Sequence, residues 1–261
     1  MRVIASDRGY LTFMLLLPIL LGALISQVPA TFGLAGAPHS NPDAGTLLLI
    51  MVICACLAGM ASSVRELVKE RSILNRERAA GLSSGAYLTS KLLLLGVISI
   101  AQSTVLVVIG VSWRPGLTRG AFLTATPLAE LIVGIAVLAV ASMCLGLLVS
   151  AIVSTSEKAM PFLVLFTMVQ VVLSGYVVPL AGNGLAALAV IAPSRWGLAA
   201  VASTVNLDGI NPPKTAISDP LWTQTSAHWL RDMGIMIGLA VIFALLAYFR
   251  LRRIGPRRRK G

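Results

Sequence analysis

The chain has 261 residues, of which 57% are hydrophobic and only 12% are charged. Because a soluble domain is roughly a quarter charged, this chain has too few polar side chains to cover a surface that faces water. The composition excludes a soluble enzyme, a secreted domain, a DNA-binding protein and a disordered chain. It predicts an all-α polytopic membrane protein.

Six apolar stretches follow one another along the chain, most of them long enough to cross a bilayer, which takes about 20 residues. Residues 1–10 are short, amphipathic and of mixed charge, which is typical of a helix lying at the membrane surface before the first span. We therefore predict an interfacial helix followed by six transmembrane helices at residues 11–28, 46–64, 92–113, 128–153, 160–180 and 233–249.

The segments between the helices differ in character. Residues 65–91 are rich in charge, and residues 250–261 form a basic tail. Residues 182–232 hold two apolar patches, Leu185–Ala192 and Trp196–Val205, that are too short to span. We expect these patches to form re-entrant or interfacial helices, within one membrane domain that covers residues 1–261.

The formal net charge of +11 is unevenly placed. With six spans, 16 of the 21 Lys and Arg residues fall on the side of the two termini and five on the other. The positive-inside rule then predicts a cytoplasmic-membrane protein with both termini in the cytoplasm. The basic tail favours contact with anionic lipid headgroups over nucleic acid.

Small residues recur at helical spacing within two of the predicted spans. The second span carries Cys56, Gly59 and Ser63, and the fourth carries Ser142, Gly146 and Ser150. Such strips let the backbone of another helix approach closely.

The sequence offers few groups for chemistry. It has no GxxxxGK[ST] motif, no HExxH or GxSxG motif, and no Cys/His spacing typical of metal sites. We therefore predict no catalytic residue, metal or cofactor in this chain. Glu130 is the exception within a span: it is either a functional intramembrane charge or a residue at headgroup level.

Residues 65–91 read RELVKERSILNRERAAGLSSGAYLTSK, with charges of alternating sign and with Glu66 and Glu70 one helical turn apart. One interpretation is a solvated extension of the second helix. The other is a docking helix that receives force from a cytoplasmic partner. The residues by themselves leave both open.

Three motifs carry a resemblance to a known family. Glu70–Arg71, Arg76–Glu77–Arg78, Gly81 and Tyr87 resemble the segment after the second helix of ATP-binding-cassette (ABC) permeases of the G-subfamily type. Leu173–Ser174–Gly175, followed by 192–197 (APSRWG), resembles the exit of that family's fifth helix and its re-entrant outer loop. Ser6–Asp7–Arg8 resembles the entry to its first helix. Among its members, the chain looks most like mycobacterial exporters in which phosphopeptide-binding FHA domains and an ATPase cassette precede the membrane domain.

The resemblance implies an ATP-driven exporter. Two permeases pair, and two cassettes that bind ATP and Mg²⁺ push on the helix after helix two; FHA domains and membrane lipid are further implied partners. The residues implied at the cassette contact are Glu70, Arg71, Arg76, Glu77, Arg78 and Gly81. The alternative class is an ion-coupled secondary transporter, which would need charges or interrupted helices near the membrane midplane.

In that family helices two and five line the cavity. Carried over by position, the substrate pathway would include Cys56, Gly59, Ser63, Thr167, Gln170, Ser174, Tyr176 and Val177. Small and polar residues in spans also hold helices together, and this is the competing interpretation. Tyr176 and Val177 stand where drug-exporting relatives have a leucine plug, and the position of their aromatic clamp is small here, near Ala58. These departures favour a lipid-like or cell-envelope glycolipid cargo.

Overall fold

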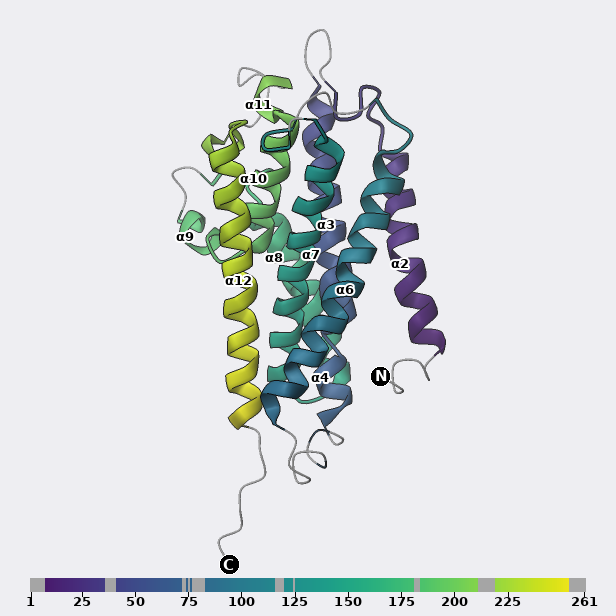
Figure 1. Cartoon of the computed structure of the whole chain (residues 1–261), viewed down its shortest axis with the longest axis vertical. Helices are drawn as coiled ribbons and strands as arrows, with labels where there is room; N and C mark the ends of the chain where they lie inside the picture. The colour runs from purple at the N-terminus through teal and green to yellow at the C-terminus, as the bar shows by residue number, and fades with distance from the viewer. Residues whose placement is uncertain are drawn as a thin grey trace, which may run out of the picture.

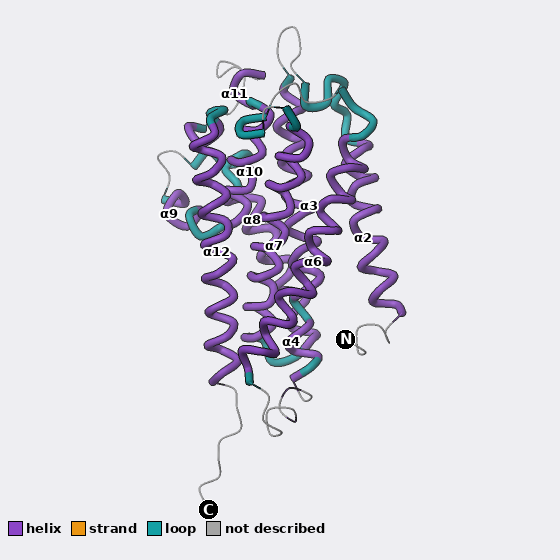
Figure 2. Tube along the Cα trace, in the orientation of Figure 1, coloured by secondary structure: helices purple, strands orange, loops and turns teal. Residues whose placement is uncertain are grey.

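A computed structural model describes residues 8–35, 41–71 with Leu74 and Arg76, 83–115, 120–123, 125–180, 184–210 and 219–253. Within these ranges the regular structure is helical, and no strand occurs (Figure 2). The long helices run side by side along one axis and form a tall bundle (Figure 1). We call the end that carries α4 (Glu66–Lys69) the lower end, as it is drawn, and the opposite end the upper end.

Five helices of the described chain are long and apolar enough to cross a membrane. They are α3 (Pro42–Ser63), α6 (Ser84–Val111), α7 (Pro127–Ile152), α8 (Ser156–Leu173) and α12 (Ser226–Arg253). A sixth helix, α2 (Arg8–Gln27), has a shorter described apolar stretch, Met14–Gln27, and runs beside α6. The prediction of an all-helical polytopic membrane protein is confirmed.

Several of the predicted helix boundaries were wrong. Helix α6 begins at Ser84 rather than 92, because the Ser83 hydroxyl accepts from the Ala86 amide and the Lys91 charge has buried partners within the bundle. Helix α12 begins at Ser226 rather than 233, since Asp232 pairs with the adjacent Arg231. Helix α8 occupies Ser156–Leu173, several residues earlier than predicted.

Short helices follow α8: α9 (Leu185–Ala189), α10 (Pro193–Val205), α11 (Leu207–Ile210) and the 3₁₀ turn η1 (Pro220–Trp222). Helix α9 lies at the side of the bundle, and α10 runs from the level of Leu138 in the middle of α7 to the upper end (Figure 1). Helix α10 lies alongside the upper part of α12 and also packs on α7 and α3 (Figure 1). Nearly all of its side chains are buried, and it ends where Asn206 adopts a left-handed conformation with φ of 57°. Short helices were expected here; their predicted re-entrant position in a membrane stays a prediction.

Helices α3 and α7 form the centre of the bundle, and their two strips of small residues face each other. A Cβ on Gly59 would overlap the Ala139 carbonyl, and one on Gly146 would overlap the Ser63 hydroxyl. Glycine is therefore needed at both positions for the backbones to come this close. The buried apolar side chains of the bundle pack above and below this contact.

The described chain starts and ends at the lower end. Helix α2 begins there and α12 finishes there, at the same end as α4 (Figure 1). Of the predicted interfacial helix, only residues 8–10 are described, and they belong to α2; of the predicted tail, residues 250–253 belong to α12. Which side of a membrane this end faces stays a prediction.

Candidate functional site

A buried ionic network fixes the charged segment beneath the bundle. The Lys91 ammonium, on α6, lies 3.0 Å from Glu66 Oε2 and 2.6 Å from Glu70 Oε1. The Tyr87 hydroxyl donates to the other Glu70 oxygen at 2.7 Å. Glu66 and Glu70 reach one lysine because residues four apart share a face of a helix. Lys91 and Tyr87 lie one turn apart on α6 for the same reason.

The same segment interlocks with the lower end of α7. The amides of Leu67 and Val68 donate to the Ser150 hydroxyl at 3.0 and 3.2 Å, so a serine of α7 caps the start of α4. In return, the Arg71 guanidinium donates to the carbonyls of Ala151 and Val153, at the end of α7. A basic side chain at that position also complements the helix dipole. Displacing α4 therefore disturbs α7 as well as α6.

The segment continues past this network. Leu74 is buried in the lower apolar core, whereas Arg76 is helical and exposed. Glu77, Arg78 and Gly81 lie outside the described residues. Of the six residues implied at a cassette contact, Glu70 and Arg71 are thus turned inward onto α6 and α7, and Arg76 is available to a partner.

Near the middle of the bundle, at the level of Leu138 of α7, the exit of α8 is tied to the start of α10. The Ser194 amide donates to Gln170 Oε1 at 2.9 Å, and the Ser194 hydroxyl donates to the Gln170 carbonyl at 2.7 Å. Arg195 pairs with Asp219 at 2.6 Å. Its guanidinium occupies the place where a Cβ on Gly175 would lie, and Gly175 has a φ of 89° that other residues rarely adopt. The two sequence motifs at 173–175 and 192–197 therefore meet in space.

Two comparisons with known proteins show the family of this chain. The family model described as "ABC-2 type transporter" matches residues 1–205. The chain is also 38% identical over 257 residues to the ABC transporter ATP-binding/permease protein Rv1747 of Mycobacterium tuberculosis. That match covers 97% of this chain and 30% of the length of the mycobacterial protein.

This chain belongs to the ABC-2 type transporter family. It is the membrane domain of an ABC transporter. The resemblance to ABC permeases, with a mycobacterial ATP-binding/permease protein as a relative, is confirmed. The roles of individual residues in the ABC-2 domain stay predictions, and the structure shows where those within the described ranges lie.

On α3, the pathway residues predicted from the sequence face α7. Cys56 is buried next to Ser142, and Gly59 and Ser63 meet Ala139 and Gly146 as described above. In this structure these residues make helix–helix contacts, as the competing interpretation expected. Their place in a pathway is untested. Ala58 is also buried in the core.

The opposite side of α3 is the more open one in this ABC-2 domain. Ile50, Ile53, Cys54 and Leu57 are half-buried and lie at helical spacing on one stripe, roughly half a turn from Cys56, Gly59 and Ser63. Sequence reasoning missed this stripe because α3 is apolar on all sides, so the periodicity of its residues does not say which face is open.

On α8, Thr167, Gln170 and Ser174 share a buried face. Thr167 and Ser174 donate to carbonyls of their own helix, and Gln170 binds Ser194. After the helix, Tyr176 lies against Gly45 with its hydroxyl 3.4 Å from the Thr46 hydroxyl, and Val177 is exposed. The other side of α8 is apolar and exposed, at Val164, Leu165, Met168 and Val172.

Glu130 is enclosed by protein in this structure, and its level relative to a membrane stays a prediction. Its carboxylate is fully buried and accepts from the amides of Ala121, Phe122 and Leu123 at 2.7–3.0 Å, and from the Thr204 hydroxyl at 2.7 Å. Four donors satisfy the charge, which makes burial tolerable. Glu130 therefore fastens the loop before α7 and the end of α10 to α7.

The described residues contain no cluster of three or more His, Cys, Asp and Glu side chains that could hold a metal ion. Cys54, Cys56 and Cys144 are free thiols within α3 and α7.

Beyond the end of α6, the Arg114 guanidinium donates to the carbonyls of Ile25, Ser26 and Val28 at the end of α2. Burial lowers the pKa of Arg114, and the side chain stays charged because arginine starts so high.

Proposed function

We propose that this ABC-2 membrane domain is the translocation part of an ATP-driven exporter. Its partner would be an ATP-binding cassette, fused or separate, that supplies ATP and Mg²⁺ chemistry, while this chain would contribute no catalytic residue. The mycobacterial relative is named as an ATP-binding/permease protein, which supports a cassette partner. FHA domains are a further proposed partner, by resemblance.

The observation that carries the proposal is the network of Glu66, Glu70 and Lys91. A cassette that closes on ATP would press on the segment around Arg76. Because Glu70 and Arg71 are bonded to α6 and α7, the displacement passes directly into two long helices. The ion pairs between α6 and the segment around α4 can also break and re-form when the two shift relative to each other. They therefore suit a contact whose geometry changes during transport.

We further propose that two copies of the chain enclose the pathway. The half-buried stripe of α3 and the exposed apolar side of α8 belong to the two helices that the family resemblance assigns to the cavity. Both surfaces are aliphatic, at Ile50, Ile53 and Leu57 on α3 and at Val164 and Met168 on α8. Such a lining favours a lipid-like or cell-envelope glycolipid cargo over a charged solute.

The lower end would face the cytoplasm in the cytoplasmic membrane. The reason is the charge count, since 16 of the 21 basic residues fall on the side of the termini. The cassette would then meet α4 on the side where ATP is available.

The first test is to purify the transporter from its own membranes in mild detergent and identify every protein present in a fixed ratio. An ATPase cassette is expected, on the same polypeptide or as a separate chain. If the protein is isolated without any ATPase, the exporter proposal fails.

The second test reverses the charges at the contact, with Arg76→Glu and Glu77→Lys together. ATP hydrolysis should persist while lipid export into vesicles falls at least tenfold, because the cassette no longer moves the segment. Lys158→Glu is the matched control, an exposed charge at the same end of the bundle. Normal export by the double variant would contradict the coupling role.

A further inference from the structure

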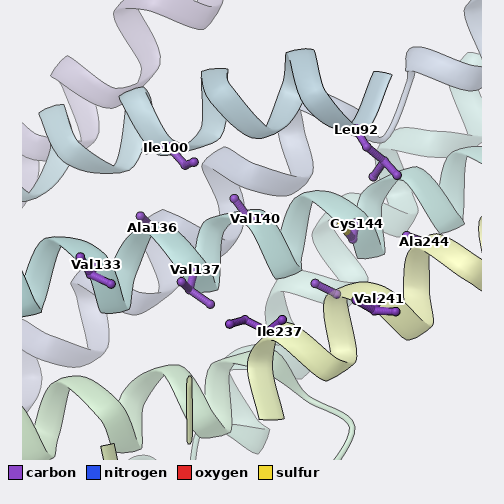
Figure 3. A pocket seen from close by; sticks show the side chains of 11 residues that line it. Leu92, Ile100, Val133, Ala136, Val137, Val140, Cys144, Ile237, Val241 and Ala244 are labelled. Atoms are coloured by element: carbon purple, nitrogen blue, oxygen red, sulfur yellow. The ribbon is translucent and has the colours of Figure 1, made fainter. Parts of the chain in front are cut away.

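A long apolar groove lies on a different face of the bundle from the proposed pathway. It has a volume of about 550 Å³, and its walls come from α6, α7 and α12. Figure 3 shows side chains of these three helices turned toward the same space, with Leu92 and Ala244 toward one end and Val133 toward the other. The α7 residues that form the floor, among them Val137 and Val140, lie about a third of a turn from those that meet α3.

The groove has the shape and chemistry of a site for a hydrocarbon chain. Its lining residues are aliphatic apart from the Cys144 thiol, so no strong hydrogen-bonding side chain faces it. The lining on α7 runs from Val133 to Cys144, which corresponds to about 16 Å along the helix axis. All three walls are candidate membrane spans, so the groove runs parallel to the acyl chains of the surrounding lipid.

The lower end of the groove adds a charge. Tyr248 continues the groove-lining face of α12 below Ala244, and its ring comes within 3.7 Å of the place of a Cβ on Gly85 of α6. Arg252 follows eleven residues after Val241, which is close to three full turns, so it lies on the same face and is exposed. Tyrosine and arginine at the end of a span are typical of the headgroup level.

We infer that this groove binds an anionic glycerophospholipid, with one acyl chain along α7 and the phosphate beside Arg252. Basic residues at the ends of grooves between spans are a common way of selecting anionic lipids. The bound lipid fills the space between α6 and α12, which otherwise meet mainly through α7. The site is separate from the pathway on α3 and α8, so its occupant is a resident lipid rather than the transported cargo.

The test places a fluorescent reporter in the groove of the complete transporter, reconstituted in phosphatidylcholine vesicles. Val241→Trp lies on the rim of the groove, while Leu246→Trp, similarly exposed, lies on another side of α12. Brominated phosphatidylglycerol should quench the Val241→Trp reporter at about fivefold lower mole fraction than brominated phosphatidylcholine does, the preference expected from one basic residue at a lipid surface. The Leu246→Trp reporter should show no such preference.

Two charge variants complete the design. Arg252→Gln should abolish the preference at the Val241→Trp reporter, whereas Arg250→Gln, which removes the same charge from the opposite face of α12, should leave it intact. The inference is overturned if both variants act alike, since that indicates general surface charge. It is also overturned if both reporters respond equally, or if the Val241→Trp reporter is not quenched at all because a protein segment covers the groove.

Discussion

The two ends of the bundle both bury carboxylates, and they satisfy them in different ways. At the lower end, Glu66 and Glu70 share the ammonium of Lys91, which belongs to another helix. At the upper end, Glu130 accepts from three consecutive backbone amides and one hydroxyl. The comparison teaches that carboxylates paired with a cation on another helix connect two elements that can shift, whereas a carboxylate surrounded by amides holds a loop in place.

The largest effect on stability is expected at the network of Glu66, Glu70 and Lys91. Lys91→Met leaves the buried Glu66 and the half-buried Glu70 without their cation and should lower the free energy of unfolding by about 3–5 kcal/mol. Chemical unfolding in mixed micelles measures this difference. Adding Glu66→Gln and Glu70→Gln to Lys91→Met should recover most of the loss. A cost below about 1 kcal/mol for the single variant would show that the network is not what holds the segment.

At the upper end, removing the Glu130 carboxylate should loosen the loop at residues 121–123. Glu130→Ala removes the acceptor of three amides and should cost about 2–3 kcal/mol, because donors left unpaired in the interior lose their hydration without compensation. Hydrogen exchange of residues 121–123 should speed up while that of α4 is unchanged. Glu157→Ala, at an exposed position of α8, serves as the control. Faster exchange at both ends would mean that the two ends are not independent.

Helices α3 and α7 run between the two ends of the bundle, and their close contact depends on glycine. Gly146→Ala should cost about 1–3 kcal/mol, since its Cβ would overlap the Ser63 hydroxyl. Gly238→Ala is the matched control: Gly238 is also helical, but nothing lies within 4 Å of its Cβ position. That variant should stabilise the protein by about 0.5–1 kcal/mol through helix propensity alone. Equal effects of the two variants, measured by the same unfolding assay, would rule out a close α3–α7 contact.

Much of the fold was predictable from the sequence, because length and apolarity decide which segments span a bilayer. The facing strips of small residues on α3 and α7 were visible as well, at Gly59 and Gly146. The starts of α6 and α12 were misplaced because Lys91 and Asp232 were taken as signs of a loop. Lys91 is buried with partners 21 or more residues away, which a one-dimensional pattern does not reveal. Asp232 is buried beside the adjacent Arg231, so that two neighbouring charges stand inside a helix.

The candidate sites were harder to predict than the fold. The spacing of Glu66 and Glu70 indicated a shared face, but the lysine that completes it is identified only once α6 is placed beside α4. The face of α3 that is open could not be read at all, since both of its sides consist of apolar and small residues. Ser150 of α7 illustrates the remaining difficulty. Its hydroxyl caps the start of α4, a contact that the sequence does not indicate because it depends on where the ends of α7 and α4 meet in space.

Side chains of α6 and of the segment after it bind backbone carbonyls of α2 and tie the two helices together. Pro18 has no amide hydrogen, so the Met14 carbonyl one turn earlier lacks its usual donor within the helix. The Gln102 side chain of α6 fills that position at 2.8 Å, and Arg114 holds the far end of α2. Between them, Gly22 and Gly110 let the two helices touch closely. Helices α2 and α6 are thus held together along the upper half of α6, from Gln102 to Arg114, and Lys91 lies near the lower end of α6. We therefore expect a tilt of α6 imposed at Lys91 to carry α2 with it, because these contacts join the two helices.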